Sequence, residues 1–153
     1  MSTKAELRRE LMARRAALTP EDVAAASAVV FEKLRAMDWS AVGSVHIYRS
    51  VTEWGELDTS AFVNWLDPRI AVVQPTLSKD QPFPEQQFDV ILVPALGFDR
   101  DSNRLGLGGG WYDRFVAQQS RAQKIGIAYE WGLVEGGIPN EPWDMKLDCV
   151  ITD

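Results

Sequence analysis

Two stretches near the start of the chain carry apolar residues at helical spacing. The residues from 4 to 18 are rich in Ala, Leu, Arg and Glu, which favour helices, and their leucines recur on one side. The sequence TPED at 19–22 then signals a new helix start, with Thr19 as the N-cap, a proline in the first turn and acids near the positive end of the helix dipole. The pattern predicts one helix over 4–18 and a second from residue 20 to about residue 37.

Short apolar runs, separated by turns and short helical patterns, predict β-strands in the rest of the chain. The run VILVP at 90–94 is continuously apolar, which is typical of a strand buried on both faces. Strands that alternate with helices favour an α/β fold, here a single domain over 1–153 with a mostly parallel sheet flanked by helices on both faces. The expected strands are 45–48, 70–73, 89–94, 124–129 and 149–152, and the expected later helices are 60–66 and about 110–119.

One connection between predicted strands does not fit this alternation. Residues 76–88 read TLSKDQPFPEQQF, with two prolines and no helical spacing. A crossover between parallel strands normally contains a helix. We therefore expect an irregular segment at this point of the fold.

Composition and charge narrow the classes of function. Hydrophobic residues make up 46% of the chain and charged residues 25%, which is typical of a globular protein. Sixteen basic against 22 acidic side chains give a net charge of -6, which argues against a nucleic-acid-binding face but not against a single basic pocket for a nucleotide. No stretch approaches the ~18 apolar residues of a membrane span, and the charged start MSTKAELRRELMARR lacks a signal-peptide core. We expect a cytoplasmic protein that binds neither nucleic acid nor membrane, as a monomer or weak homo-oligomer.

The single cysteine and the single histidine suggest little chemistry. Cys149, in the apolar run DCVIT, has no partner for a disulfide within the chain, which suits a reducing compartment. We interpret it as a small buried hydrophobe rather than a nucleophile. His46 lies in the predicted strand at 45–48 without a second His or Cys ligand nearby, and we interpret it as structural.

The stretch RLGLGGGWYDRF at 104–115 is the strongest candidate site. It follows a predicted strand and precedes a predicted helix, where glycines let backbone N–H groups approach an anion. Arg104 offers a planar fork to phosphate oxygens, and Asp113 is placed to hold a divalent cation that the phosphates share. The pattern is neither a Walker A loop nor the usual dinucleotide fingerprint. The alternative is a tight turn with positive φ angles, in which Trp111 and Tyr112 simply pack in the core.

The sequence alone does not decide the roles of three acidic residues. Glu53 and Glu56 lie on either side of a Trp-Gly turn after the first predicted strand. Either at least one of these carboxylates faces the cleft at the carboxyl ends of the strands, or the loop is a solvated acidic loop. Asp144 stands between Trp143 and Met145, as either a cap or a ligand.

Taken together, these motifs resemble the 5-formyltetrahydrofolate cyclo-ligase (5,10-methenyltetrahydrofolate synthetase) family. The residues from 104 to 113 match its central pattern Arg-Leu-Gly-x-Gly-x-Gly-aromatic-Tyr-Asp throughout. Four shorter family motifs, in the family's order, are Lys4 with Arg8, Glu56 in ELDT, Phe98 with Asp99, and Asp144 in EPWDMKL. Two departures stand out: the family's glycine before the central arginine is missing, with SN at 102–103 instead, and the chain is short for the family around 76–88.

The resemblance implies ATP-dependent cyclisation of 5-formyltetrahydrofolate to 5,10-methenyltetrahydrofolate, with release of ADP and phosphate. It implies Mg²⁺ as cofactor, held by Asp113 and Asp144, and catalytic roles for Arg104 and Lys4. A catalytically impaired relative that only binds nucleotide or folate is the alternative, and a second aromatic wall opposite Trp111 would favour the enzyme. Implied ATP contacts are Lys4, Arg8, Arg104, Leu105, Gly106, Leu107, Gly108, Gly109, Gly110, Trp111 and Tyr112; implied folate contacts are Val51, Glu56 and Trp111; candidates for the second wall are Trp65, Phe83 and Phe88.

Overall fold

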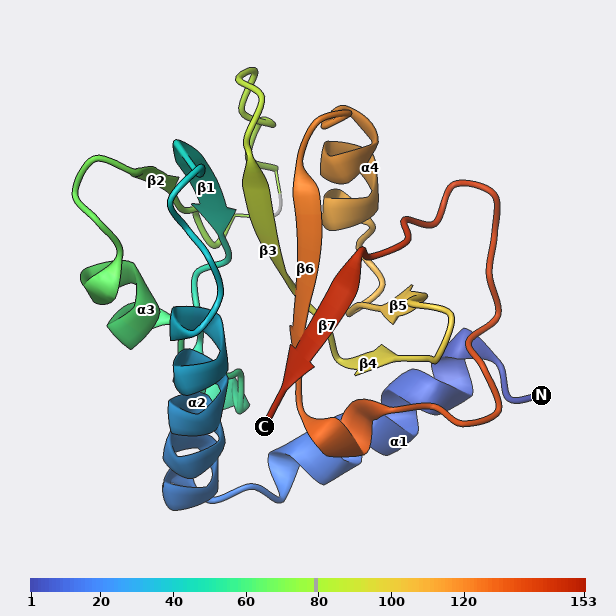
Figure 1. Ribbon diagram of the computed structural model, residues 1–153. Coiled ribbons are helices and arrows are strands. Elements are labelled where there is room, and N and C mark those ends of the chain that lie inside the picture. Colours follow the sequence, from blue (N-terminus) through green and yellow to red (C-terminus); the bar gives the residue numbers. More distant parts are fainter. Residues whose placement is uncertain (79) are drawn as a thin grey trace.

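The computed structural model describes residues 1–78 and 80–153 and is built around a five-stranded parallel sheet (Figure 1). The strand order is β2-β1-β3-β6-β7, and neighbouring strands pair in parallel throughout. This confirms the predicted α/β class. The sheet strands are β1 (Ser44–Ile47), β2 (Ala71–Val73), β3 (Val90–Pro94), β6 (Gln123–Ala128) and β7 (Cys149–Thr152). The helices are α1 (Lys4–Ala16), α2 (Pro20–Arg35), α3 (Ser60–Trp65) and α4 (Trp111–Ala117), with short 3₁₀ turns η1 (Thr52–Trp54) and η2 (Glu130–Gly132).

Helices cover both faces of the sheet, as the alternation predicted. Along β3, Val90 and Leu92 point into a core shared with α2 and α3. Ile91 and Val93 point to the opposite face, into a core shared with α4. All four side chains are at most 3% exposed, which explains why this strand is apolar at successive positions.

The first two helices begin where the sequence predicted. Thr19 caps α2 in a reciprocal capping box with Asp22, and Thr3 caps α1 in the same way with Glu6. α1 carries Leu7 and Leu11 toward the carboxyl ends of the strands, where they join a separate apolar cluster. No helix in the described part of the chain is both long and apolar enough to cross a membrane.

A two-stranded hairpin, β4 (Gly97–Phe98) with β5 (Arg104–Leu105), was not predicted. It lies beside α1 in Figure 1 and carries Arg104 into the site described below. Its turn is held by the buried Asp99 carboxylate, which accepts the N–H groups of Asp101, Asn103 and Ile138. Burial alone would raise the pKa of Asp99, but these hydrogen bonds hold it below its usual value. The same turn contains Ser102, whose φ of 62° lies in the left-handed region that side chains rarely adopt.

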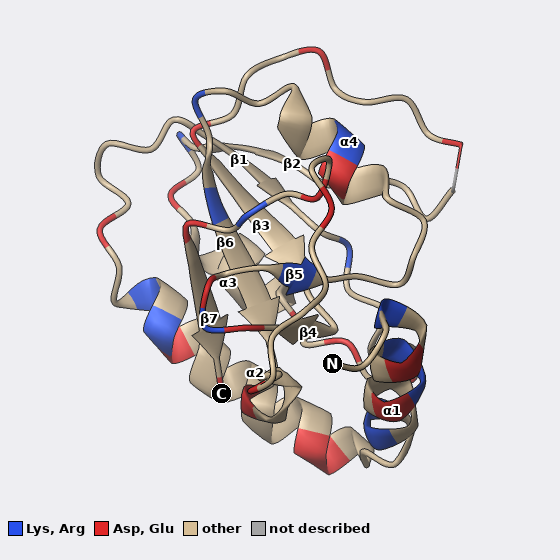
Figure 2. Ribbon diagram, turned by 90° about the vertical axis from the view of Figure 1, so that its right-hand side faces the viewer, with Lys and Arg blue, Asp and Glu red and all other residues tan. Residues whose placement is uncertain are grey.

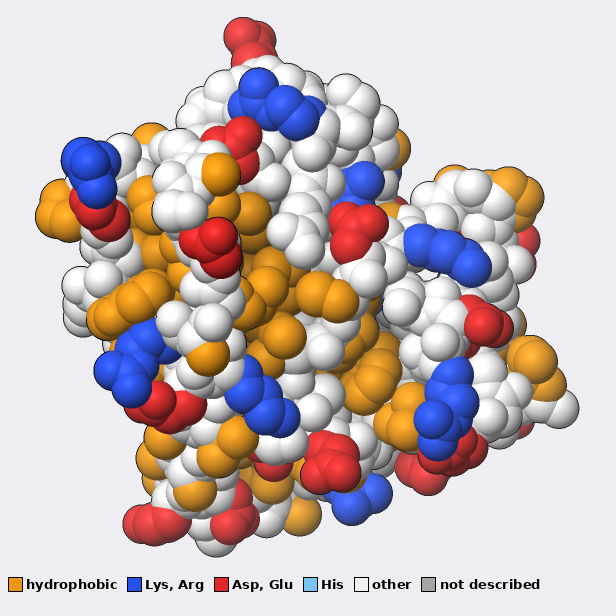
Figure 3. Space-filling view, in the orientation of Figure 1, with side chains coloured by type: hydrophobic (Ala, Val, Ile, Leu, Met, Phe, Trp, Pro, Cys, Tyr) orange, Lys and Arg blue, Asp and Glu red, His pale blue; other side chains and the backbone are white. Residues whose placement is uncertain are grey.

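The edge strand β7 is half-buried rather than buried. Figure 3 shows hydrophobic side chains gathered in the middle of the face that carries β7 in Figure 1, with Lys, Arg, Asp and Glu mostly around its rim. Cys149, at the start of β7, is half-buried, and burial raises the pKa of its thiol. This environment keeps the thiol protonated, in agreement with a packing role.

The connection from β2 to β3 crosses β1 without a helix. Residue 79 lies outside the described residues, and the rest of the stretch 74–89 forms neither helix nor strand. Phe88 at its end is fully buried beside β3. The irregular segment predicted from its two prolines is therefore present.

Candidate active site

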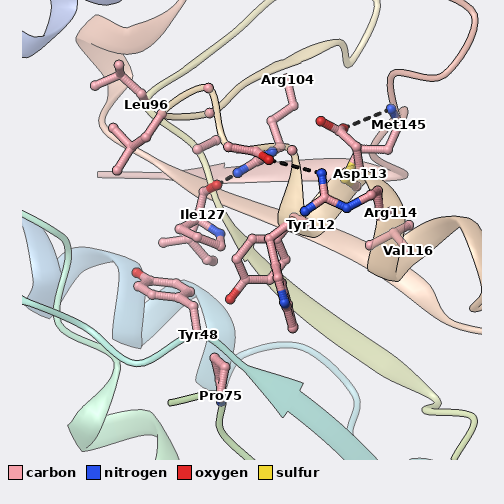
Figure 4. Close-up of a pocket in the computed structure, with 18 of the residues that line it drawn as sticks. Tyr48, Pro75, Leu96, Arg104, Tyr112, Asp113, Arg114, Val116, Ile127 and Met145 are labelled. Carbon is pink, nitrogen blue, oxygen red and sulfur yellow. Dashed lines mark hydrogen bonds between the residues drawn. The ribbon is translucent and has the colours of Figure 1, made fainter. Parts of the chain in front are cut away.

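A cavity of about 1620 Å³ opens at the carboxyl ends of β1, β3 and β6. Seven segments of the chain line it: α1, the turn after β1, the irregular connection after β2, the end of β3, the glycine loop with α4, β6 with the turn that follows it, and the loop before β7. Figure 4 shows the rings of Tyr48 and Tyr112 close together on its wall, with Arg104 and Asp113 toward one end and Pro75 toward the other. This is the position at which open α/β sheets bind their ligands.

The glycine loop connects β5 to α4 along the cavity. Gly108 and Gly110 have φ angles of +107° and +72°, which side chains rarely adopt. A Cβ on Gly109, by contrast, would meet nothing within 4 Å, because this residue faces open space in the cavity. The tight turn proposed as the alternative reading is therefore real at 108 and 110, but it does not explain a glycine at 109.

Arginines fix the carbonyl groups of this loop. Arg8 on α1 donates from Nε to the Gly106 carbonyl oxygen at 3.0 Å. Arg114 on α4 donates from Nη1 to the Gly109 carbonyl oxygen at 3.0 Å. The loop is thus tied to α1 at one end and to α4 at the other.

Arg104 is held at the end of β3. Its Nε donates to the Pro94 carbonyl oxygen at 2.8 Å, and its guanidinium carbon lies 5.4 Å from the centre of the Tyr112 ring. Burial lowers the pKa of Arg104, and the nearby Asp113 opposes that effect. Lys4, Arg8 and Arg104 line one cavity, so this acidic chain contains a basic pocket, and Figure 2 shows basic residues on α1, β5 and α4.

The two candidate metal ligands are linked through the loop before β7. The Met145 N–H donates to Asp113 Oδ1 at 3.1 Å, and Met145 directly follows Asp144. Asp144 forms an ion pair with Lys4 and also accepts the Glu141 N–H at 2.8 Å. Burial would raise the pKa of Asp144, but these hydrogen bonds and the Lys4 charge hold it below its usual value. Asp144 therefore both caps a turn and presents a carboxylate to the cavity.

Glu56 occupies a rigid turn on another wall of the cavity. Its Oε2 accepts the Val51 N–H at 3.0 Å. The carbonyl groups on either side are each bound by a tyrosine: Tyr129 donates its hydroxyl to the Gly55 oxygen and Tyr48 donates to the Leu57 oxygen, both at 2.7 Å. Burial raises the pKa of Glu56, while the Val51 N–H and the charge of Arg15 lower it.

The three predicted candidates for a second aromatic wall, Trp65, Phe83 and Phe88, do not line the cavity. Trp65 packs on Phe31 and Phe62 away from the cavity, and Phe88 is buried in the core. Phe83 contacts Trp111, with ring centres 5.3 Å apart. The other aromatic side chains on the cavity are Tyr48, Trp54, Tyr129 and Trp131, together with the exposed Trp143.

Most of the predicted site residues meet at this cavity. Among the described residues, every predicted ATP, folate and metal contact lines it except Leu105 and Val51. The Leu105 side chain is 1% exposed and packs against α1, and its carbonyl oxygen accepts the Leu96 N–H at 2.9 Å. Val51 supports Glu56 through its N–H.

The residues missed by sequence reasoning belong to no motif. Tyr48 and Tyr129 directly follow β1 and β6, so the rule that ligands bind at the carboxyl ends of parallel strands identifies them once the strands are known. Arg15, Trp54 and Trp131 carry no comparable signal, since only the folded chain brings them to the cavity.

Comparison with protein families decides the relationship of this chain. The model of the 5-formyltetrahydrofolate cyclo-ligase family matches residues 53–153, which is more than half of the sequence. The chain belongs to this family. Among curated cyclo-ligases, that of Mycoplasma pneumoniae is 46% identical over 72 residues, covering 46% of this chain and 43% of the relative. The Escherichia coli K12 cyclo-ligase is 37% identical over 86 residues, covering 55% and 47%. These matches thus span about half the length of the curated relatives.

Solved structures extend the similarity over the whole cyclo-ligase fold. The 5,10-methenyltetrahydrofolate synthetase of Mycoplasma pneumoniae superposes with a TM-score of 0.86 at 28% identity, covering 99% of both chains. The Aquifex aeolicus synthetase, at 23% identity and a TM-score of 0.77, shares the fold. The segment around 76–88 lies within this shared fold, and its shortening relative to the family stays a prediction.

Proposed function

We propose that this cyclo-ligase family member converts 5-formyltetrahydrofolate and ATP to 5,10-methenyltetrahydrofolate, ADP and phosphate. One observation carries the proposal: a single cavity is lined both by a glycine loop with three cations and by a rigid glutamate among aromatic rings. The first part suits a triphosphate and the second suits a pteridine. A reaction that transfers phosphate between two such ligands needs both of them in one cavity.

At the nucleotide end, positioning and charge neutralisation are the main requirements of phosphoryl transfer. Lys4, Arg8 and Arg104 would neutralise the triphosphate, and Gly109 would let it approach the backbone. The formyl oxygen would attack the γ-phosphorus and displace ADP. N10 would then attack the activated carbon and lose its proton, and phosphate would leave with the former formyl oxygen as the ring becomes the methenyl product.

A magnesium ion fits the same end of the cavity. Mg²⁺ is usually held by one or two carboxylates, with phosphates and water completing its shell. Asp113 and Asp144 supply that donor set, and the described residues contain no group of three or more His, Cys, Asp or Glu side chains placed to bind a metal by themselves. When bound, Mg²⁺ would neutralise charge on the phosphates. Lys4, paired with Asp144 here, would then be released toward the phosphates.

At the folate end, Glu56 would accept hydrogen bonds from the 2-amino and N3–H groups of the pteridine. Two tyrosine hydroxyls hold the backbone on both sides of Glu56, and the Val51 N–H holds its carboxylate. Trp111 would cover the folate, and its Nε1 donates to the Gln81 carbonyl oxygen at 3.3 Å, which fixes the indole against the connection after β2. Val51 would act through the N–H that it donates to Glu56.

The test is the absorbance of the methenyl product after mixing protein, 5-formyltetrahydrofolate, ATP and Mg²⁺. We expect a rise that requires all four components. The matched control replaces ATP by a non-hydrolysable analogue, which should bind without producing the absorbance. No rise, with ATP binding still measurable by calorimetry, would overturn the proposal in favour of a family member that only binds its ligands.

A further inference from the structure

Arg15 is a buried cation that has no assigned role at the cavity. It lies near the end of α1, is 7% exposed, and lines the cavity. Its Nε is inaccessible to solvent and has no hydrogen-bond partner among the described residues. No carboxylate of the described residues forms an ion pair with it. A buried N–H without an acceptor costs free energy, and a ligand in the cavity that brought an acceptor to this guanidinium would offset that cost.

The fold places this guanidinium beside Glu56. The Arg15 side chain packs under Gly55, where an added Cβ would lie 2.7 Å from Arg15 Cγ, so that only glycine allows the approach. Glu56 follows directly, and the charge of Arg15 acts on its carboxylate. Tyr129 donates its hydroxyl to the Gly55 oxygen and so holds the same turn in place. One wall of the cavity thus holds a carboxylate fixed by the Val51 N–H and, near it, a guanidinium whose stem packs under Gly55.

That arrangement matches one edge of a 2-amino-4-oxo pteridine ring. The 2-amino and N3–H groups are two donors in a row, and the C4 carbonyl oxygen is an acceptor immediately beside them. A carboxylate alone satisfies the two donors and leaves the carbonyl oxygen without a partner. A neighbouring guanidinium supplies it.

We propose that Arg15 is a specificity-determining residue that donates a hydrogen bond to the C4 carbonyl oxygen of the folate, beside the contacts of Glu56. This rests on the proposed function, because it assumes that Glu56 binds the pteridine. The contact selects 4-oxo folates over 4-amino analogues, since the 4-amino group is a donor and would face the guanidinium N–H groups.

The experiment compares dissociation constants for 5-formyltetrahydrofolate and for its 4-amino-4-deoxy analogue by calorimetry. Wild type is measured beside Arg15→Met, Arg15→Lys and the control Arg9→Met, which removes an exposed cation from the same helix. In wild type the 4-oxo compound should bind more tightly. Arg15→Met should reduce the preference about 10- to 100-fold, the range for a hydrogen bond to a charged group, and Arg9→Met should leave it unchanged.

Folding and function are followed separately. Because the Arg15 Nε makes no hydrogen bond, Arg15→Met should unfold at or above the wild-type temperature and keep its ATP affinity. Arg15→Lys keeps the charge but moves the donor, so it should lose part of the preference. If Arg15→Met and Arg15→Lys each lose the same affinity for the 4-oxo and the 4-amino compound, Arg15 does not recognise the C4 substituent. This inference is then wrong, while the proposed function stands. If wild type forms no methenyl product, the proposed function fails and the inference with it.

Discussion

Replacing Gly109 by alanine separates a phosphate-binding role from a purely conformational one. Gly109 has no positive φ, and an added Cβ would meet nothing within 4 Å, so the folded chain accommodates the methyl group without strain. Such a substitution stabilises a protein by about 0.4–1 kcal/mol, because it restricts the unfolded chain. For a chain of this size we expect a melting temperature about 1–4 °C higher. The same methyl group would project into the cavity, where it would obstruct a close phosphate at about 1–3 kcal/mol, or roughly 5- to 150-fold in ATP affinity.

The assay is ATP titration by calorimetry together with thermal unfolding of the free protein. Gly136→Ala is the matched control, since Gly136 also has open space and no positive φ but lies outside the main cavity. It should stabilise equally without changing ATP affinity. Gly108→Ala should instead destabilise, because its φ of +107° costs an alanine about 1–2 kcal/mol. Unchanged ATP affinity in a stabilised Gly109→Ala protein would refute the phosphate role of this loop.

Three further substitutions test the two ends of the cavity. Glu56→Gln removes a carboxylate whose pKa is raised by burial, so the charged form opposes folding. Thermal melts should show the variant at least as stable as wild type at neutral pH. This gain should shrink as the pH falls through the pKa of folded Glu56 and vanish below the pKa of the unfolded carboxyl, while titration shows weaker folate binding. Tyr129→Phe leaves the buried Gly55 oxygen without its donor, which should cost about 1–3 kcal/mol of stability, or about 2–12 °C in melting temperature. Folate affinity should fall while ATP affinity stays the same. A melting temperature equal to that of wild type would contradict this prediction. Asp144→Asn should raise the Mg²⁺ concentration for half-maximal turnover by roughly tenfold or more, and an unchanged Mg²⁺ response would remove Asp144 from the metal site.

The sequence predicted the regular elements well because local signals and burial agree there. The capping box at Thr19 and the apolar run of β3 are short-range features that need no knowledge of the rest of the chain. The motif from 104 to 113 likewise predicted a cavity-lining loop without any knowledge of the fold. The β4–β5 hairpin was missed because each strand has only two residues, and its turn depends on Asp99 accepting the N–H of the distant Ile138.

The folate end of the site was harder to predict for a related reason. Glu56 is in a motif, but the residues around its turn include Tyr48 and Tyr129, which follow β1 and β6, and Arg15 on α1, and these meet only in the folded chain. Tyr129 and Arg15 act on the Gly55–Glu56 turn across 74 and 40 positions of sequence. Such contacts leave no periodic pattern, and a tyrosine after a strand or an arginine on a charged helix has many ordinary roles.

The connection from β2 to β3 covers part of one face of the sheet and also lines the cavity. A helix in this crossover would pack on the sheet beside α4 and fill the space next to Trp111. The irregular chain contacts the indole instead, through the Gln81 carbonyl oxygen and the Phe83 ring, and lines the cavity with Pro75 and Leu77. Leu77 is 61% exposed, so this wall ends at solvent. This described part of the connection therefore forms a cavity wall that is open to solvent at Leu77, while it holds Trp111 in place on the other side.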